Sequence, residues 1–210
     1  MKKSFSLLSV VLLSASMLSA QEFRMGLTGA MNVSRYAVES AGVSVDTDSR
    51  IGFKAGFRVE MDAPFIADGF YFDGELLLSS RGAKLNSIVN EADVKLTSRP
   101  YYLEVPIHIG YRMPLGENFS VFGSFGPYFA VGIFGTERLT TAGVSSKPDA
   151  FSSENLKRFD FGLGLRAGVA MFDHYRIYLG YDWGLVNIAQ HSAEDKINNR
   201  NFYVGMAYMF

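Results

Sequence analysis

The chain has 210 residues, of which 48% are hydrophobic, 14% aromatic and 20% charged. This composition fits neither a disordered chain nor a bundle of membrane helices. The absence of cysteine excludes disulfides, thiol catalysis and cysteine-ligated metal centres. Because the formal net charge is −1, no basic excess is available for nucleic acid, and we expect no nucleic-acid partner.

The amino terminus has the layout of a secretory signal peptide. Lys2 and Lys3 precede an apolar stretch, residues 5–18, which ends in small residues before Gln21. The stretch is too short and too rich in serine for a transmembrane helix. We therefore predict that residues 1–20 are a cleaved signal peptide and that residues 21–210 form the mature domain. Removing the two lysines leaves 18 basic and 21 acidic residues, a net charge of −3.

In the mature chain, apolar residues recur at every second position, which is the period of β-strands. A tilted strand of about 9 to 11 residues crosses the hydrocarbon layer of a membrane, a length that suits these segments. No charged residue lies on their apolar faces. The predicted strands cover residues 23–33, 51–61, 70–78, 101–113, 119–133, 159–171, 177–185 and 202–210.

Connection lengths indicate which face meets lipid. The connections 62–69, 114–118 and 173–175 are short, whereas the other four are long. This alternation is typical of outer-membrane barrels, with tight periplasmic turns, longer external loops and both chain ends on the periplasmic side. The predicted fold is therefore all-β, an eight-stranded antiparallel up-and-down transmembrane β-barrel of the bacterial outer membrane.

The opposite strand faces carry all the strand charges, balanced between basic and acidic residues. An eight-stranded ring is only wide enough inside for its own side chains. We expect these charges to pair into a polar plug, with inward glycines making room for the arginines; an open pore is the alternative. The expected lumen network is Arg24, Lys54, Arg58, Glu60, Asp73, Glu75, Arg81, Glu104, His108, Arg112, Asp160, Arg166 and Asp182. Inward tyrosines that could add hydroxyl partners are Tyr71, Tyr102, Tyr128, Tyr178 and Tyr203.

Two features complicate the strand assignment. Pro106 and Pro127 lie inside predicted strands, where a missing N–H breaks the ladder, so we expect bulges or irregular pairing there. The segment 135–157 contains a β-prone stretch, residues 139–145. We expect it to form a short hairpin above the membrane rather than further spanning strands.

Several short motifs occur in an order and spacing that are similar to a known family. They are residues 26–29 (GLTG), 52–56 (GFKAG), 79–84 (SSRGAK), 102–106 (YLEVP), 126–128 (GPY), 159–162 (FDFG) and 199–200 (NR). The chain resembles the PorT-like outer-membrane β-barrel family of Bacteroidota, also described as a porin family, over nearly the whole mature sequence. The resemblance implies a barrel, and the family's namesake is linked to type IX protein secretion.

Residues that could carry chemistry are few. His108 is predicted inward between Glu104 and Arg112, where a buried, bonded histidine is expected. His191-Ser192 with Glu194 has the residue types of a hydrolase trio, but adjacent residues on a polar loop seldom reach nucleophile–base geometry. Asp46 and Asp48 suggest a solvated loop rather than a cation site. We expect no catalytic residue, no metal, no cofactor and no enzymatic activity.

The carboxyl terminus alternates Phe202, Val204, Met206, Tyr208 and Phe210. This pattern resembles the signal that outer-membrane assembly machinery reads by strand pairing. Expected partners are outer-membrane lipid, that machinery, periplasmic chaperones and a protein or glycan ligand at the external loops.

The expected function is binding, adhesion or envelope structure through these loops. The alternatives are a small porin or transport component, an accessory to type IX secretion, and a lipid-modifying hydrolase.

Overall fold

The structure is a computed structural model that describes residues 23–40, 43–89, 92–141, 144–152, 156–190 and 196–210. Within these ranges, no helix is long and apolar enough to cross a membrane. The described residues contain eleven strands: β1 (Phe23–Ser40), β2 (Val43–Asp46), β3 (Asp48–Asp62), β4 (Phe70–Ser80), β5 (Ala83–Val89), β6 (Ala92–Pro114), β7 (Phe119–Thr141), β8 (Val144–Ser146), β9 (Phe159–Met171), β10 (Tyr175–Gly184) and β11 (Lys196–Met209).

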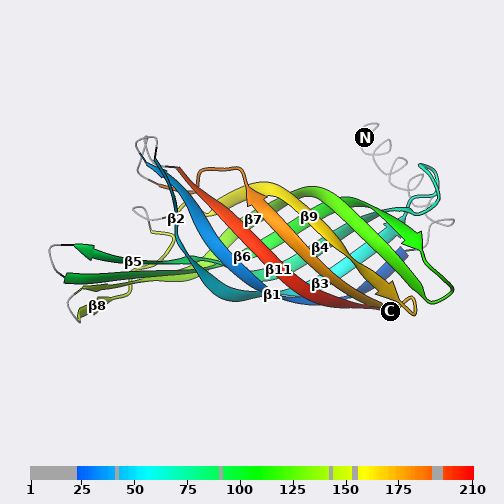
Figure 1. The fold of residues 1–210 in the computed structure, drawn as a ribbon, viewed down its shortest axis with the longest axis horizontal. Helices are drawn as coiled ribbons and strands as arrows, with labels where there is room; N and C mark the ends of the chain where they lie inside the picture. The colour runs from blue at the N-terminus through cyan, green and yellow to red at the C-terminus, as the bar shows by residue number, and fades with distance from the viewer. Residues whose placement is uncertain (1–22, 41–42, 90–91, 142–143, 153–155, 191–195) are drawn as a thin grey trace, which may run out of the picture.

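Eight of the described strands form a closed antiparallel ring in the order β1, β3, β4, β6, β7, β9, β10, β11. The ring closes where β11 pairs with β1, from Gly26 opposite Met209 to Glu39 opposite Lys196. Figure 1 shows the resulting tilted barrel, with blue β1 beside red β11. Closure leaves the eight-stranded ring itself without a free edge, which a sheet needs in lipid because unpaired backbone groups are costly there. The predicted eight-stranded barrel is confirmed.

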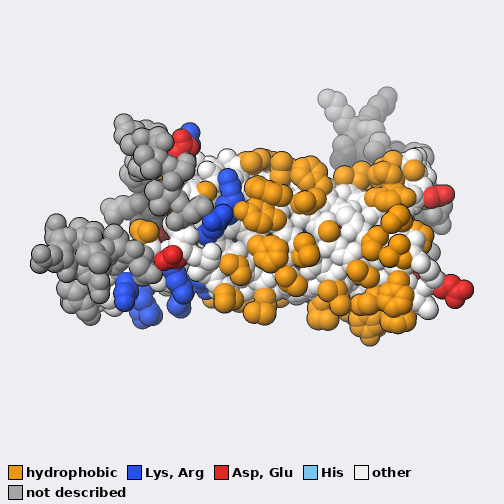
Figure 2. Space-filling view, in the orientation of Figure 1, with side chains coloured by type: hydrophobic (Ala, Val, Ile, Leu, Met, Phe, Trp, Pro, Cys, Tyr) orange, Lys and Arg blue, Asp and Glu red, His pale blue; other side chains and the backbone are white. Residues whose placement is uncertain are grey.

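The two faces of the barrel wall carry opposite kinds of side chain. The residues predicted to face lipid point outward, as Met31 does with 68% of its surface exposed, whereas Arg58 on the inner face is fully buried. Figure 2 shows apolar side chains spread over the outer wall, with Lys and Arg gathered toward the end that carries the long connections. Such an outer surface suits acyl chains and not water.

The strand ends define a turn end and a loop end. At the turn end, residues 63–69, 115–118 and 172–174 connect consecutive spanning strands. Phe172 and Asp173 have φ angles of 51° and 61°, the left-handed conformation that reverses the chain in the shortest of these turns. The carboxyl terminus lies at this same end in Figure 1. The alternation of short and long connections predicted from sequence is therefore present.

The sheet continues well beyond the apolar outer wall at the loop end. β6 and β7 are 23 residues long each, or about 75 Å if fully extended, which is more than twice the thickness of a hydrocarbon core of about 30 Å. Beyond the stacked rings of Tyr101 and Phe134, these strands pair with β5 and β8. We call this part, residues 83–89, 92–99, 135–141 and 144–146, the projection; it extends to the left in Figure 1.

The projection corrects the predicted strand boundaries. The hairpin expected at residues 139–145 is present as the pairing of β8 with the end of β7. The β5–β6 hairpin was not predicted, and β6 begins at Ala92 rather than at Tyr101.

The prolines interrupt pairing without shifting the register. Between β4 and β6, the ladder lacks pairs at Val105 and Pro106. Between β6 and β7, it lacks pairs from Ile107 to His108, opposite Gly126 and Pro127, and resumes in the same register. Irregular pairing is therefore found as expected, but the bulge lies elsewhere, between Tyr101 and Tyr102.

Candidate functional site

The upper layer of the lumen, nearer the loop end, is built around Arg81 and Lys54. Arg81 follows β4 and forms ion pairs with Glu104 of β6 at 2.6 Å, Asp160 of β9 at 3.3 Å and Asp182 of β10 at 3.4 Å. Lys54 of β3 pairs with Glu104 at 2.7 Å and with Asp182 at 2.6 Å. Because β4 and β10 lie on opposite sides of the ring, these contacts cross the barrel.

A second layer lies nearer the turn end. Arg58 of β3 pairs with Glu75 at 2.8 Å, Glu60 at 3.0 Å and Asp73 at 3.3 Å. Arg166 reaches across from β9 to Glu75 at 2.8 Å and to Asp73 at 3.1 Å. Glu75 and Asp73 are thus each shared by two guanidinium groups, the arrangement that offsets the cost of burying charge.

His108 and the inward tyrosines fill the space between the charges. His108 is buried, with Nδ1 3.5 Å from Asp73 Oδ1. The Tyr128 hydroxyl donates to Asp160 at 3.1 Å, but Tyr102 forms no such bond. The rings contribute more through cation–π contacts, with Arg81 4.7 Å from the Tyr128 centroid and Lys54 4.3 Å from that of Tyr203.

The expectation about inward glycines needs a correction. A Cβ atom at Gly110 would overlap the ring of Tyr71, and one at Gly180 would overlap the ring of Tyr203. Gly110 and Gly180 therefore make room for tyrosine rings rather than for arginines.

Several polar residues inside the barrel were not predicted, and four of them pair with the charges of the predicted network. Arg176, buried on β10, forms an ion pair with Glu60 at 3.3 Å. Asn199 and Asn201 donate hydrogen bonds to Asp160 and Asp182 at 2.9 and 3.1 Å. Asp62 pairs with Arg24 at 2.7 Å. The period-two alternation that predicts Asp182 to point inward also predicts this for Arg176, so the sequence pattern could have identified Arg176. Asp62 was missed because it was assigned to the predicted turn 62–69.

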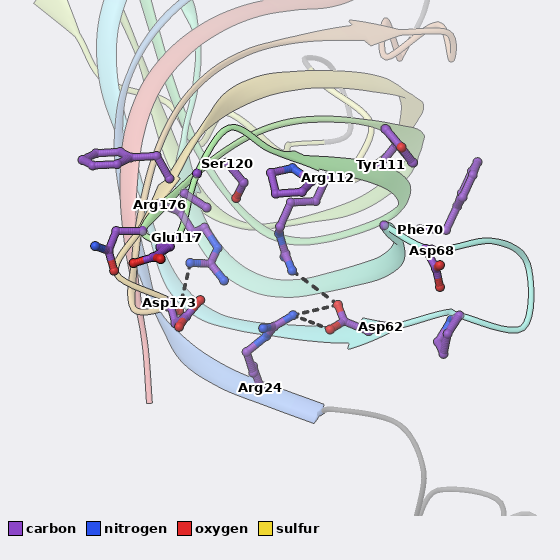
Figure 3. A pocket seen from close by; sticks show the side chains of 17 residues that line it. Arg24, Asp62, Asp68, Phe70, Tyr111, Arg112, Glu117, Ser120, Asp173 and Arg176 are labelled. Carbon is purple, nitrogen blue, oxygen red and sulfur yellow. Dashed lines mark hydrogen bonds and ion pairs between the residues drawn. The ribbon is translucent and has the colours of Figure 1, made fainter.

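The turn end opens into a pocket of about 630 Å³, the turn-end pocket. In Figure 3, the side chains of Arg24 and Arg112 converge on Asp62, and Arg176 lies beside Asp173. The pocket is also lined by Asp68 and Glu117, so both signs of charge are present.

Ion pairs link the lining of the turn-end pocket to the second layer of the lumen. Glu60 is buried and pairs with Arg112 at 2.6 Å, with Arg176 at 3.3 Å and with Arg58 at 3.0 Å. The acidic and basic side chains of the wall are paired with each other here. Such pairing favours a structural role for these charges over binding of a charged ligand.

The structure brings together the remaining predicted residues only in part. His191, Ser192 and Glu194, like the predicted signal peptide, lie outside the described residues. The side chain of Asp46 is also outside the described part, and that of Asp48 is exposed. Among the residues that the structure describes, no cluster of three or more His, Asp or Glu side chains could hold a metal ion. Phe202, Val204, Met206, Tyr208 and Phe210 all face outward at the strand that closes the ring.

Comparison with known proteins gives one family and several similar folds. A model of the outer membrane protein beta-barrel domain matches residues 19–190. No curated protein matches the sequence.

Three solved structures illustrate the likeness. Ail, the attachment invasion locus protein of Yersinia pestis, solved with the heparin analogue sucrose octasulfate, is 16% identical over 90% of this chain and 99% of its own, with a TM-score of 0.43. Neisserial surface protein A is 12% identical over 88% and 97%, with a TM-score of 0.41. OprG from Pseudomonas aeruginosa is 14% identical over 90% and 95%, with a TM-score of 0.49. At these identities and scores, the likenesses carry no argument about function.

Proposed function

Because this chain belongs to the outer membrane protein beta-barrel domain family and lies in the bacterial outer membrane, we propose that it is a non-enzymatic surface-binding barrel. Its lumen is closed by the ion network, and it acts through its external end in binding, adhesion or envelope structure. The ligand class that we favour for this end is a protein or a glycan. Membership of the PorT-like group and a role in type IX secretion rest on the motif resemblance alone; normal secretion by a deletion strain would dismiss that role.

The projection is the observation that carries this proposal. β6 and β7 continue past the Tyr101–Phe134 pair and recruit β5 and β8. Arg99 and Arg138 are exposed on this part of the sheet. Strands that only line a membrane channel can be shorter than β6 and β7, since about 9 to 11 residues cross the hydrocarbon layer. An extended sheet edge and face, in contrast, are surfaces that other molecules bind.

The binding role can be tested by shortening the projection. Ala83 and Ser98 are paired across the β5–β6 hairpin, so residues 84–97 can be replaced by an Asn-Gly turn without altering the barrel. We expect cells carrying the shortened protein to lose retention on immobilised glycans or matrix proteins that retain wild-type cells. Glu117→Gln, at the turn end, serves as the control. Undiminished retention by the shortened protein would contradict the proposal.

Closure of the lumen can be tested by conductance. We expect the purified protein in planar bilayers to give no stable stepwise conductance, because buried ion pairs cross the lumen. Arg81→Ser removes the side chain that joins β4 to β10 and should produce measurable conductance. Stable steps from the wild-type protein would instead favour a small porin or transport component, whose entrance would be the turn-end pocket.

A further inference from the structure

An apolar cavity lies inside the loop end. Its volume is about 230 Å³, and it is a partly open hollow lined by strands β1, β5, β6, β7 and β11, by Thr47 and by the segment that contains Leu156. Val38, Leu85, Leu96 and Ile197 supply most of its apolar lining. We call it the loop-end cup. It is separate from the ion network and from the turn-end pocket, since it shares no lining residue with that pocket.

One carboxylate faces the loop-end cup. Glu137 of β7 accepts a hydrogen bond from Ser98 Oγ at 3.3 Å, and Ser98 in turn bonds the hydroxyl of Tyr36 at 3.1 Å. Unlike most acids of the lumen, Glu137 forms no ion pair with any cation in the part of the chain that the structure describes. Lys84 borders the cup but is exposed, on the opposite face of β5 from Leu85.

This setting leaves Glu137 short of a counter-charge. Burial raises the pKa of Glu137, and the hydrogen bond from Ser98 offsets part of that rise. Among the described side chains, the carboxylate thus has the Ser98 hydroxyl as its hydrogen-bond donor and no counter-charge, an arrangement in which a bound cation would form an ion pair with a partly buried carboxylate. Most of the remaining surface of the cup is apolar and would contact an apolar part of a ligand.

We propose that the loop-end cup binds a small amphipathic cation, a primary ammonium group carried on an apolar body, with Glu137 as its counter-ion. A water molecule occupies about 30 Å³ of liquid, so a cavity of 230 Å³ holds a ligand of roughly eight non-hydrogen atoms. The inference rests on the proposed function, in that it names a ligand class for the external binding end.

The test uses the full mature protein in phospholipid nanodiscs, with n-heptylamine as the probe and 1-heptanol as its uncharged match. Binding is followed by methyl NMR shifts of Val38, Leu85 and Ile197, with empty nanodiscs as the reference for partitioning. We expect saturable shifts, with a dissociation constant at least tenfold lower for the amine than for the alcohol. Glu137→Gln should remove that preference and leave heptanol binding unchanged.

Two further variants keep the test decisive. Glu137→Asp retains the charge and should retain the preference for the amine, which separates a counter-ion role from a purely structural one. Glu117→Gln, at the opposite end of the barrel, should bind both probes as the wild type does. Equal affinity for both probes in the wild type, or no saturable shift of the cup methyls, would overturn the inference. Conductance by the wild type would overturn lumen closure and leave this result standing.

Discussion

Arg81 and Leu165 illustrate opposite costs of charge at single residues. Arg81 is fully buried, yet three carboxylates from three other strands surround it. Leu165 lies in the middle of β9 with 47% of its surface exposed on the outer wall. A charge is tolerated at the first position because partners are fixed in place, and no such partner exists on the lipid side.

Leu165→Arg should therefore destabilise the folded barrel by about 2 to 4 kcal/mol, the cost of a cation near the middle of a bilayer. The measurement is the free energy of unfolding in phospholipid vesicles from urea titration. Lys147→Arg, at an exposed position of the loop end, is the matched control and should change the free energy little. An equally small effect of Leu165→Arg would contradict the outward orientation of this face.

At the scale of elements, the projection differs from the barrel wall on which it stands. Below the Tyr101–Phe134 pair, β6 and β7 have strand neighbours on both sides in a closed ring. Above it, within the described residues, the side of β7 away from β6 pairs with the three residues of β8 and, through an isolated bridge at Thr136, with Asp149. Fewer backbone partners imply a lower free energy of local opening than in the wall.

Opening of the projection should depend on pH through Glu137. Burial raises the pKa of this carboxyl in the folded state, so its contribution to stability is present below the ordinary glutamate value of about 4.3 and is lost as pH rises through the raised value. Tyr36 also borders the cup, and because burial raises the pKa of its hydroxyl further, it stays uncharged in this range.

Amide exchange of residues 95–99 and 135–139, corrected for intrinsic rates, should therefore show weaker protection at pH 7 than at pH 5. Glu137→Gln should make the two values equal. Protection that increases with pH in the wild type would contradict the assigned direction.

At the scale of the whole molecule, the sequence predicts the strands of the barrel wall better than the pairing of β5 and the ion pairs inside the lumen. Period-two alternation locates the eight spanning strands, and the connection lengths identify the face that meets lipid, because neither property depends on which strands are neighbours. The extra pairing of β5 was not predictable, since Ala83 to Val89 mixes polar and apolar residues and depends on β6. Arg176 was missed because it lies next to a turn, and the pairing partners of Arg81 require the three-dimensional ring.

The orientation of the whole barrel can be tested with introduced thiols, because the chain has no cysteine of its own. Lys147→Cys at the loop end and Glu117→Cys at the turn end each place one thiol at an exposed position. A membrane-impermeant maleimide added to intact cells should label the first variant and leave the second unlabelled until the outer membrane is permeabilised. The reverse pattern would invert the assignment of external and periplasmic ends.

The pairing of β1 with β11 has a consequence for connectivity. Phe210 donates its backbone N–H to Met25 at 2.7 Å, so the two ends of the ring already lie together at the turn end, where Pro114 and Phe119 are also joined by a short connection. A circularly permuted gene, in which a short linker joins residue 210 to residue 23 and the reading frame starts at Phe119, would encode the same cylinder with every ladder intact.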